Sequence, residues 1–147
     1  MRVGICGDGN GPVDVSRYSG KVKVACVGDS ITFGYGISKG NSYPLQLQRM
    51  LGEKFEVRNF GVNSTTLLNK GDNPYEKEKA MGAAVEFEPD VVVIMLGTND
   101  TKPLNWKYEG DFAADYKELA GRFLELKSHP RIWLAHPCPV PADGKWD

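Results

Sequence analysis

The 147 residues, 41% of them hydrophobic, suffice for one domain with a real core, since a chain of this length buries roughly two thirds of its unfolded surface. The 18 basic and 19 acidic residues are scattered and give a formal net charge of -1, so we expect no nucleic-acid partner. No segment has the apolar length of a membrane span or a signal peptide, which predicts no membrane association and a cytoplasmic protein, with an exported form left open.

Residues 1–20 contain five glycines and one proline without periodicity, which predicts a loose arm or the end of a preceding segment. The cysteines are Cys6, Cys26 and Cys138, an odd number without CxxC spacing, which predicts neither a disulfide framework nor a metal site. Cys26 lies inside an apolar run, where a small buried hydrophobic residue fits. We therefore expect no metal and no organic cofactor.

Residues 21–147 are expected to form one domain, in which apolar runs of strand length alternate with longer mixed segments. The expected strands cover residues 21–27, 55–60, 89–96 and 131–135, and the expected helices cover residues 42–52, 75–87 and 111–127. The run "VVVIML" at 91–96 is continuously apolar, as in strands buried on both faces. The pattern predicts an α/β protein with a parallel sheet between two helical layers, a three-layer α/β/α sandwich.

Polar turns follow the first three expected strands, and ligands bind in such sheets at the edge where parallel strands end. Ser30 closes the first turn, where nearby backbone N–H groups can hold a developing negative charge. Gly61, after the second strand, lets a substrate oxygen approach its backbone N–H, and Asn99, after the third, offers a side-chain amide. These groups suit acyl transfer, whereas the alternative is that Ser30 only caps a turn.

The segments "GDSITFGYG" (28–36), "NFGVNSTT" (59–66) and "GTND" (97–100) resemble the first three sequence blocks of the SGNH hydrolases, also called the GDSL esterases and lipases. The resemblance implies the family's flavodoxin-like fold, with Ser30 as nucleophile, Gly61 as backbone oxyanion donor and Asn99 as side-chain oxyanion donor. The chain departs from the second block at Asn63-Ser64, where the family often has Ser-Gly.

The segments "KPLNW" (102–106) and "HPCPVP" (136–141) resemble the bacterial branch that removes acetyl groups from sugars, including sialate O-acetylesterases and acetylxylan esterases. We place Asp29, Asp100, Asn105 and Trp106 around the substrate. Asp29 and Asp100 adjoin motif residues and are expected to fix their loops by accepting backbone N–H bonds, not to act as the acid of a catalytic triad. Trp106 is expected either to stack on a sugar or to cover the core.

A serine nucleophile needs a base, usually a histidine oriented by a carboxylate. The family carries both in a late Asp-x-x-His block, which this sequence lacks. We therefore expect a C-terminally incomplete fold, without the fifth strand and the last helix. His136, which Asp143 could orient, lies at the correct edge, but in the family's strand order 2-1-3-4 it is two strands, roughly 10 Å, from Ser30. His136 is thus either the base or a loop residue, and His129 is expected as a solvated loop residue at the opposite edge.

Three functions stay open from the sequence. The first is a serine esterase that hydrolyses small acyl esters, expected to be acetyl esters of carbohydrates, through an acyl-enzyme on Ser30. The second is a catalytically incomplete fragment or module that binds carbohydrate. The third, a phosphate-binding or nucleotide-binding flavodoxin-like domain, is disfavoured because the first loop lacks the Gly-Lys-[Ser/Thr] ending of a P-loop. An unpaired fourth strand also predicts self-association.

Overall fold

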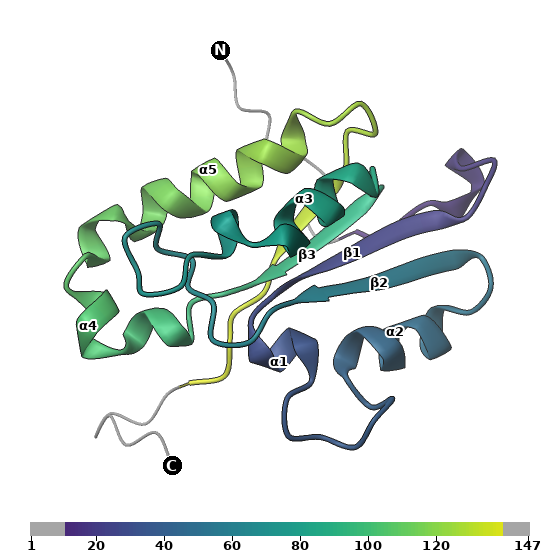
Figure 1. Cartoon of the computed structure of the whole chain (residues 1–147). Coiled ribbons are helices and arrows are strands. Elements are labelled where there is room, and N and C mark those ends of the chain that lie inside the picture. The colour runs from purple at the N-terminus through teal and green to yellow at the C-terminus, as the bar shows by residue number, and fades with distance from the viewer. Residues whose placement is uncertain (1–10, 140–147) are drawn as a thin grey trace.

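The computed structural model describes residues 11–139, in which four parallel strands form one sheet in the order β2-β1-β3-β4 (Figure 1). The strands are β1 (Val22–Gly28), β2 (Phe55–Gly61), β3 (Val91–Met95) and β4 (Arg131–Leu134). Gly28 at the end of β1 lies opposite Gly61 of β2 and Met95 of β3. The predicted parallel sheet is confirmed, and the loops after three neighbouring strands begin at one level.

Short and long helices connect these strands. They are α1 (Ser30–Phe33), α2 (Tyr43–Leu51), α3 (Lys79–Glu86), α4 (Pro103–Trp106) and α5 (Phe112–Leu124), with 3-10 turns η1 (Val15–Arg17), η2 (Tyr75–Lys77), η3 (Asn99–Thr101) and η4 (Glu109–Asp111). The helix predicted over 42–52 is confirmed as α2, with Ser42 at the N-cap position, where its side chain makes no capping hydrogen bond, and with Gly52 at the C-cap. The helix predicted over 75–87 is interrupted, because Glu78 is extended (φ -79°, ψ 146°) between η2 and α3. The helix predicted over 111–127 is α5, which is shorter at both ends.

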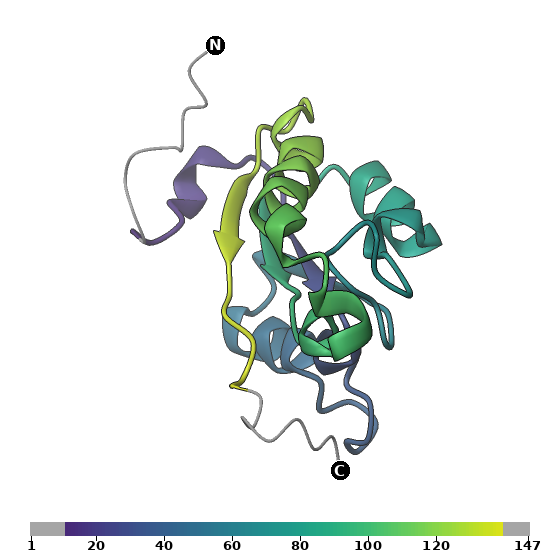
Figure 2. The ribbon, with the colours of Figure 1, turned by 90° about the vertical axis from the view of Figure 1, so that its left-hand side faces the viewer.

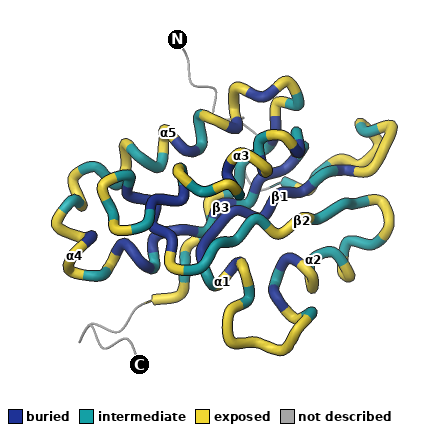
Figure 3. Tube along the Cα trace, in the orientation of Figure 1, coloured by how far each residue is buried: buried dark blue, intermediate teal, exposed yellow. Residues whose placement is uncertain are grey.

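The sheet lies between two helical layers, as Figure 1 shows, with α3 and α5 on one face and α1 and α2 on the other. Successive side chains of β3 alternate between the two layers: Val92 and Ile94 pack with α3 and α5, while Val91 and Val93 pack on the face of α2. The strands at the centre of the sheet are the most buried part of the trace (Figure 3). The predicted α/β/α sandwich is thereby confirmed.

Residues 11–20 are not a loose arm in the part that the structure describes. This segment contains η1, and its side chains Val13 and Tyr18 pack on the face of the sheet that α2 covers. The Lys54 ammonium group donates hydrogen bonds of 2.9 Å to the carbonyls of Tyr18 and Gly20. Figure 2 shows the segment on the side of the sheet where β4 lies. Cys6, by contrast, falls outside the described residues.

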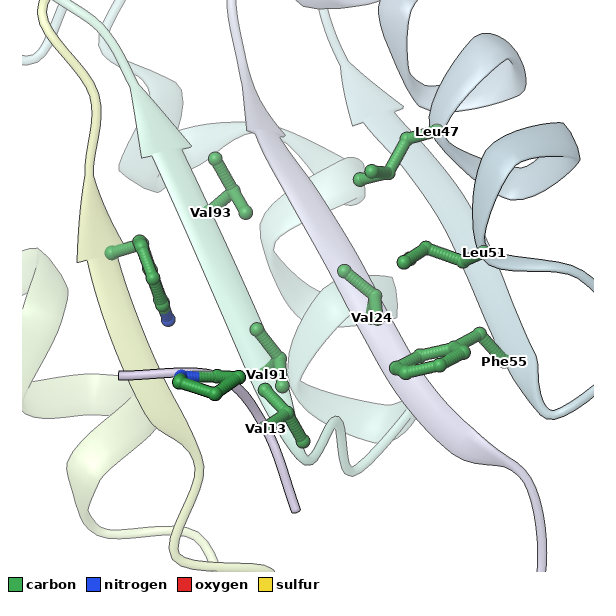
Figure 4. Close-up of a pocket in the computed structure, with 9 residues that line it drawn as sticks. Val13, Val24, Leu47, Leu51, Phe55, Val91 and Val93 are labelled. Atoms are coloured by element: carbon green, nitrogen blue, oxygen red, sulfur yellow. The ribbon is translucent and has the colours of Figure 1, made fainter. Parts of the chain in front are cut away.

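An apolar groove of about 420 Å³ remains on this face of the sheet, as the side chains in Figure 4 show. Its lining residues are Pro12, Val13, Val24, Leu47, Leu51, Phe55, Val91, Val93 and Trp133. The groove crosses this face, from Leu47 and Leu51 of α2 on the β2 side to Trp133 of β4. Among residues 11–139, no helix combines the length and apolarity that a membrane crossing requires.

Candidate active site

Ser30 begins α1 directly after β1, at the edge of the sheet where the strands end. Asp29 caps this single helical turn, since its Oδ1 accepts a 2.9 Å hydrogen bond from the Ile31 N–H. Gly34 (φ 91°) ends the turn and donates its N–H to the Ser30 carbonyl at 2.9 Å. Neither the hydroxyl nor the backbone N–H of the half-buried Ser30 has a hydrogen-bond partner among the described residues.

Asp29 lies directly before Ser30 and caps the helical turn that Ser30 begins. Asp29 is 1% exposed, so it offers no accessible atom to a substrate, which corrects its assignment as a substrate-binding residue. Burial above all raises the pKa of this carboxyl, against the bond from the Ile31 N–H, which lowers it. Its Oδ2 lies near the Thr98 hydroxyl without the geometry of a hydrogen bond. Asp29 therefore fixes its own loop, as its position beside the serine predicts.

Asn99 begins η3 after β3, and its side chain is 7% exposed. Its Nδ2 donates a 3.0 Å hydrogen bond to the carbonyl of Thr65 in the loop after β2. The second hydrogen of this amide has no acceptor within residues 11–139. One N–H of Asn99 thus holds the neighbouring loop, and the other is left for a ligand.

Asp100 is fully buried and fixes the same neighbouring loop. Its two carboxylate oxygens accept the N–H groups of Leu67 at 3.0 Å and Leu68 at 2.7 Å. Burial, the largest influence, raises the pKa of this carboxyl, while the two N–H groups lower it. The predicted loop-fixing role is confirmed, and the assignment of Asp100 to substrate binding is wrong because the side chain is 0% exposed.

Asn105 and Trp106 are both predicted to lie near the substrate, but only Trp106 is exposed. Asn105 is 0% exposed and hydrogen-bonded to Asn99 and Asp72, so it is not a substrate contact. Trp106 is 41% exposed and packs edge-on against Phe112, with ring centroids 5.8 Å apart. One part of the indole therefore rests on the core and another part faces solvent, which leaves a sugar-stacking role as a prediction.

Gly61 is not the free backbone donor that the sequence analysis predicts. Its N–H already donates a 2.8 Å hydrogen bond to Oδ1 of Asn59, two residues earlier. A Cβ at this position would lie 2.8 Å from Phe33 Cα and 2.8 Å from the Thr32 carbonyl carbon. The glycine is therefore needed for the close approach of α1 to β2, not for an oxyanion.

Ser64 supplies an unpaired backbone N–H in the same loop. It is exposed, and its φ of 64° lies in the left-handed region that favours glycine. No acceptor for its N–H exists in the described part of the chain, and the next residue, Thr65, is held by Asn99. Ser64 is not among the predicted site residues, although the glycine that the SGNH family, which the chain resembles, often has at this position signals such a conformation.

The two histidines of the sequence lie at opposite edges of the sheet. His129 follows α5, is exposed and precedes β4, as predicted for a loop residue at the far edge. His136 follows β4, is exposed, and is separated from β1 by β3 in the sheet. Neither histidine hydrogen-bonds to Ser30 in the described structure, and Asp143 lies outside the described residues.

The chain is similar in sequence to known proteins. The model of the GDSL-like Lipase/Acylhydrolase family matches residues 26–146. The acetylxylan esterase of Xylanibacter ruminicola is 52% identical over 100 residues, which cover 67% of this chain and 21% of that protein. The chain therefore matches about a fifth of the length of this curated relative.

Two solved structures share the fold. The inhibitor-bound aryl esterase of M. smegmatis has a TM-score of 0.63 at 23% identity, covering 80% of this chain and 65% of that chain. A carbohydrate acetylesterase family member from Sinorhizobium meliloti has a TM-score of 0.60 at 23% identity, covering 81% of this chain and 64% of that chain. At this level of identity, the similarity concerns the fold alone.

Proposed function

Since the chain belongs to the GDSL-like lipase/acylhydrolase family, we propose that it carries the nucleophile of a serine esterase, with Ser30 attacking the carbonyl carbon of an ester. The observation that carries this proposal is the state of Ser30. Its hydroxyl and its N–H are both without partners in residues 11–139, at the first turn of α1, where the orphan N–H groups of a helix favour negative charge.

We propose that the oxyanion is held by two backbone N–H groups, of Ser30 and Ser64, and by the second hydrogen of the Asn99 amide. All three donors lack an acceptor among the described residues, and Thr65 connects the loop of Ser64 directly to Asn99. Ser64 takes the place in this proposal that the sequence analysis gave to Gly61. Attack by Ser30 forms the tetrahedral intermediate, the alcohol leaves, and water then hydrolyses the acyl group from the serine.

We propose acetyl esters of carbohydrates as substrates. Support comes from the names of the relatives, an acetylxylan esterase and a carbohydrate acetylesterase family member. The half-exposed indole of Trp106 offers an aromatic surface of the kind that stacks on a sugar ring. No group of three or more His, Cys, Asp or Glu within residues 11–139 is arranged to hold a metal ion, and the proposed mechanism uses none.

The proposed mechanism also needs a base that takes the proton of the Ser30 hydroxyl. His136 lies beyond β4 and therefore two strands from Ser30, roughly 10 Å, which exceeds a direct hydrogen bond. We propose that a further part of the protein contributes the base, since this chain matches about a fifth of the length of its curated relative.

The test is acetate release from p-nitrophenyl acetate by the chain and by a protein that joins this chain to the proposed further part, called the longer protein below, each with and without Ser30→Ala. We expect hydrolysis by the longer protein that Ser30→Ala reduces by at least roughly 1,000-fold, as for other serine nucleophiles. Ser38→Ala, an exposed serine whose side chain makes no described contact, serves as the matched control. Equal rates for Ser30→Ala and the unchanged longer protein would rule out Ser30 as nucleophile.

One observation favours a second function, carbohydrate binding without turnover: no histidine hydrogen-bonds to Ser30 in the described part of the chain. In that case, the longer protein retains an acetylated xylan fragment without releasing acetate. Trp106→Ala then weakens retention, while Ser30→Ala leaves it unchanged.

A further inference from the structure

The loop of residues 62–74, which carries Ser64 between β2 and η2, is held by side chains that come later in the chain than β3. These contacts are Asn99 Nδ2 to Thr65 O (3.0 Å), Asp100 to the N–H groups of Leu67 and Leu68 (3.0 and 2.7 Å), Asn105 to Asp72, and Asp115 Oδ2 to Asn69 N (2.8 Å). Within this set, only Asn105 contacts both the loop and Asn99 itself.

The amide of Asn105 has both of its hydrogens bound. Nδ2 donates to the Asn99 carbonyl at 2.9 Å and to Oδ1 of Asp72 at 3.0 Å. In return, the Asp72 N–H donates to Oδ1 of Asn105 at 2.9 Å. The side chain is 0% exposed, so water does not compete for these bonds.

The turn that carries Asn99 depends on this contact. The backbone hydrogen bonds of η3 are long: Thr101 N to Thr98 O and Lys102 N to Asn99 O are both 3.3 Å, and the shorter bond from the Thr101 hydroxyl (2.8 Å) goes to the Thr98 carbonyl, not to Asn99. The bond from Asn105 to the same Asn99 carbonyl is 2.9 Å. Because a single 3-10 turn is a weak element, the buried side chain fixes Asn99 more firmly than the turn does.

We propose that Asn105 is a positioning residue for the oxyanion site. It holds the backbone of Asn99 through the carbonyl group and the loop of Ser64 through Asp72. The Ser64 N–H and the Asn99 amide thereby keep one fixed separation. Stabilisation of an oxyanion requires donors that are in place before the charge develops. This inference rests on the proposed role of Asn99 as an oxyanion donor.

Two substitutions separate positioning from a merely structural role. Asn105→Asp keeps the shape and the acceptor for the Asp72 N–H but removes both amide hydrogens. Adding Asp72→Asn restores the pair with its roles reversed, since the new amide at position 72 donates to the carboxylate at 105. The carboxylate still has no hydrogen for the Asn99 carbonyl. Asn41→Asp, at an exposed loop position, is the control.

Two readouts are compared: the side-chain amide signals of Asn99 in 15N–1H spectra of the chain, and kcat and KM in the longer protein. We expect both proteins that carry Asn105→Asp to shift the Asn99 signals and to lower kcat by roughly 10- to 100-fold, with KM within about twofold. The double variant recovers part of the lost melting temperature but not kcat, since the Asn99 carbonyl still lacks its donor, and the Asn41→Asp control keeps the Asn99 signals and kcat of the parent protein.

Recovery of kcat and of the Asn99 signals together with the melting temperature in the double variant would reduce Asn105 to a structural role. Unchanged Asn99 signals in Asn105→Asp would also overturn the proposal. If the longer protein shows no hydrolysis that depends on Ser30, the proposed function fails, whereas the spectra still decide whether Asn105 positions Asn99.

Discussion

The side-chain amide of Asn99 donates one hydrogen to Thr65 and leaves the other without an acceptor in residues 11–139. If the second hydrogen stabilises the oxyanion, Asn99→Ala lowers kcat of the longer protein by about 100- to 1,000-fold, as the loss of one such donor does elsewhere. The substitution also leaves the buried Thr65 carbonyl without its partner, which costs about 1–3 kcal/mol of stability. Steady-state kinetics and urea unfolding of the same preparations keep the two effects apart.

Asn69→Ala is the matched control for this experiment. Its amide donates a 3.2 Å hydrogen bond to Glu118 of α5, so its removal takes one side-chain bond from the same loop without removing a proposed oxyanion donor. A loss of kcat below about tenfold in Asn99→Ala would contradict the role of Asn99.

The buried carboxyl of Asp100 makes stability depend on pH in an unusual direction. Burial raises its pKa above the ordinary 3.8, so the folded protein holds this proton more tightly than the unfolded chain does. Its contribution to the free energy of unfolding is therefore greatest below pH 3.8 and falls as the pH rises through the raised pKa. We expect the stability difference between the unchanged chain and Asp100→Asn to fall as the pH increases from about 3.8.

Urea unfolding between about pH 3.5 and pH 7 measures this difference. Asp14→Asn is a control of opposite sign, since hydrogen bonds from the Ser16 hydroxyl and N–H lower the pKa of the exposed Asp14. Its stabilisation is present above pH 3.8 and is lost as the pH falls through the lowered pKa. A stability difference for Asp100→Asn that does not change with pH would show that burial does not raise the pKa of Asp100.

Single residues differ in how far their roles can be predicted from sequence. Ser30 and Asp100 could be placed, because the turns that follow buried strands lie at the edge of the sheet. Gly61 could not, because the acceptor of its N–H depends on the rotamer of Asn59. Asn105 could not either, because its partner Asp72 lies 33 residues earlier and meets it only through the fold.

Helices and strands likewise differ in how far they can be predicted from the sequence. The four strands and α2 were predictable, because continuous apolar runs and a helix with both caps are strong local signals. The break at Glu78 was not, since the segment contains good helix formers. It arises from tertiary contacts: the buried Tyr75 hydroxyl donates a 2.6 Å hydrogen bond to the Phe60 carbonyl in β2. The helices α1 and α4 span one turn each, too short for a periodic pattern.

The contact between α1 and β2 has a direct test in Gly61. A methyl group there would meet the backbone at Thr32 and Phe33, which cannot move like a flexible side chain, so Gly61→Ala should destabilise by about 1–3 kcal/mol. Gly82, exposed in the middle of α3, has nothing within 4 Å of its Cβ position. Gly82→Ala should stabilise the protein by about 0.5–1 kcal/mol, because alanine favours the helix.

Guanidinium unfolding of both variants measures the two effects. The same substitution at two glycines should therefore give opposite signs. A neutral or stabilising effect of Gly61→Ala would mean that α1 does not approach β2 as closely as described.

At the scale of the whole molecule, the sheet is covered unevenly. An apolar groove on the face of α2 extends as far as Trp133 of β4, and β4 has no strand on its outer side among residues 11–139. Its backbone is bonded on the inner side, where the N–H groups of Arg131 and Ala135 donate to Asp90 and Ile94 of the β3 side. Because alternate N–H groups of a strand point to opposite edges, those of Ile132 and Leu134 face outward. Such an edge is a template for pairing with another chain.

We therefore expect the chain to self-associate, with an average mass that rises above that of the monomer as its concentration increases. Leu134, 58% exposed at the end of β4, is the residue to change, since lysine on an edge strand opposes pairing. Leu134→Lys should keep the protein monomeric and alter the free energy of unfolding by no more than about 0.5 kcal/mol, as is usual at exposed positions. Met50→Lys makes the same change on α2, at a residue that is 83% exposed and away from β4, and should leave association intact. Sedimentation velocity distinguishes the outcomes: an unchanged chain that stays monomeric at every concentration, or equal dissociation by both variants, would exclude β4 as the contact.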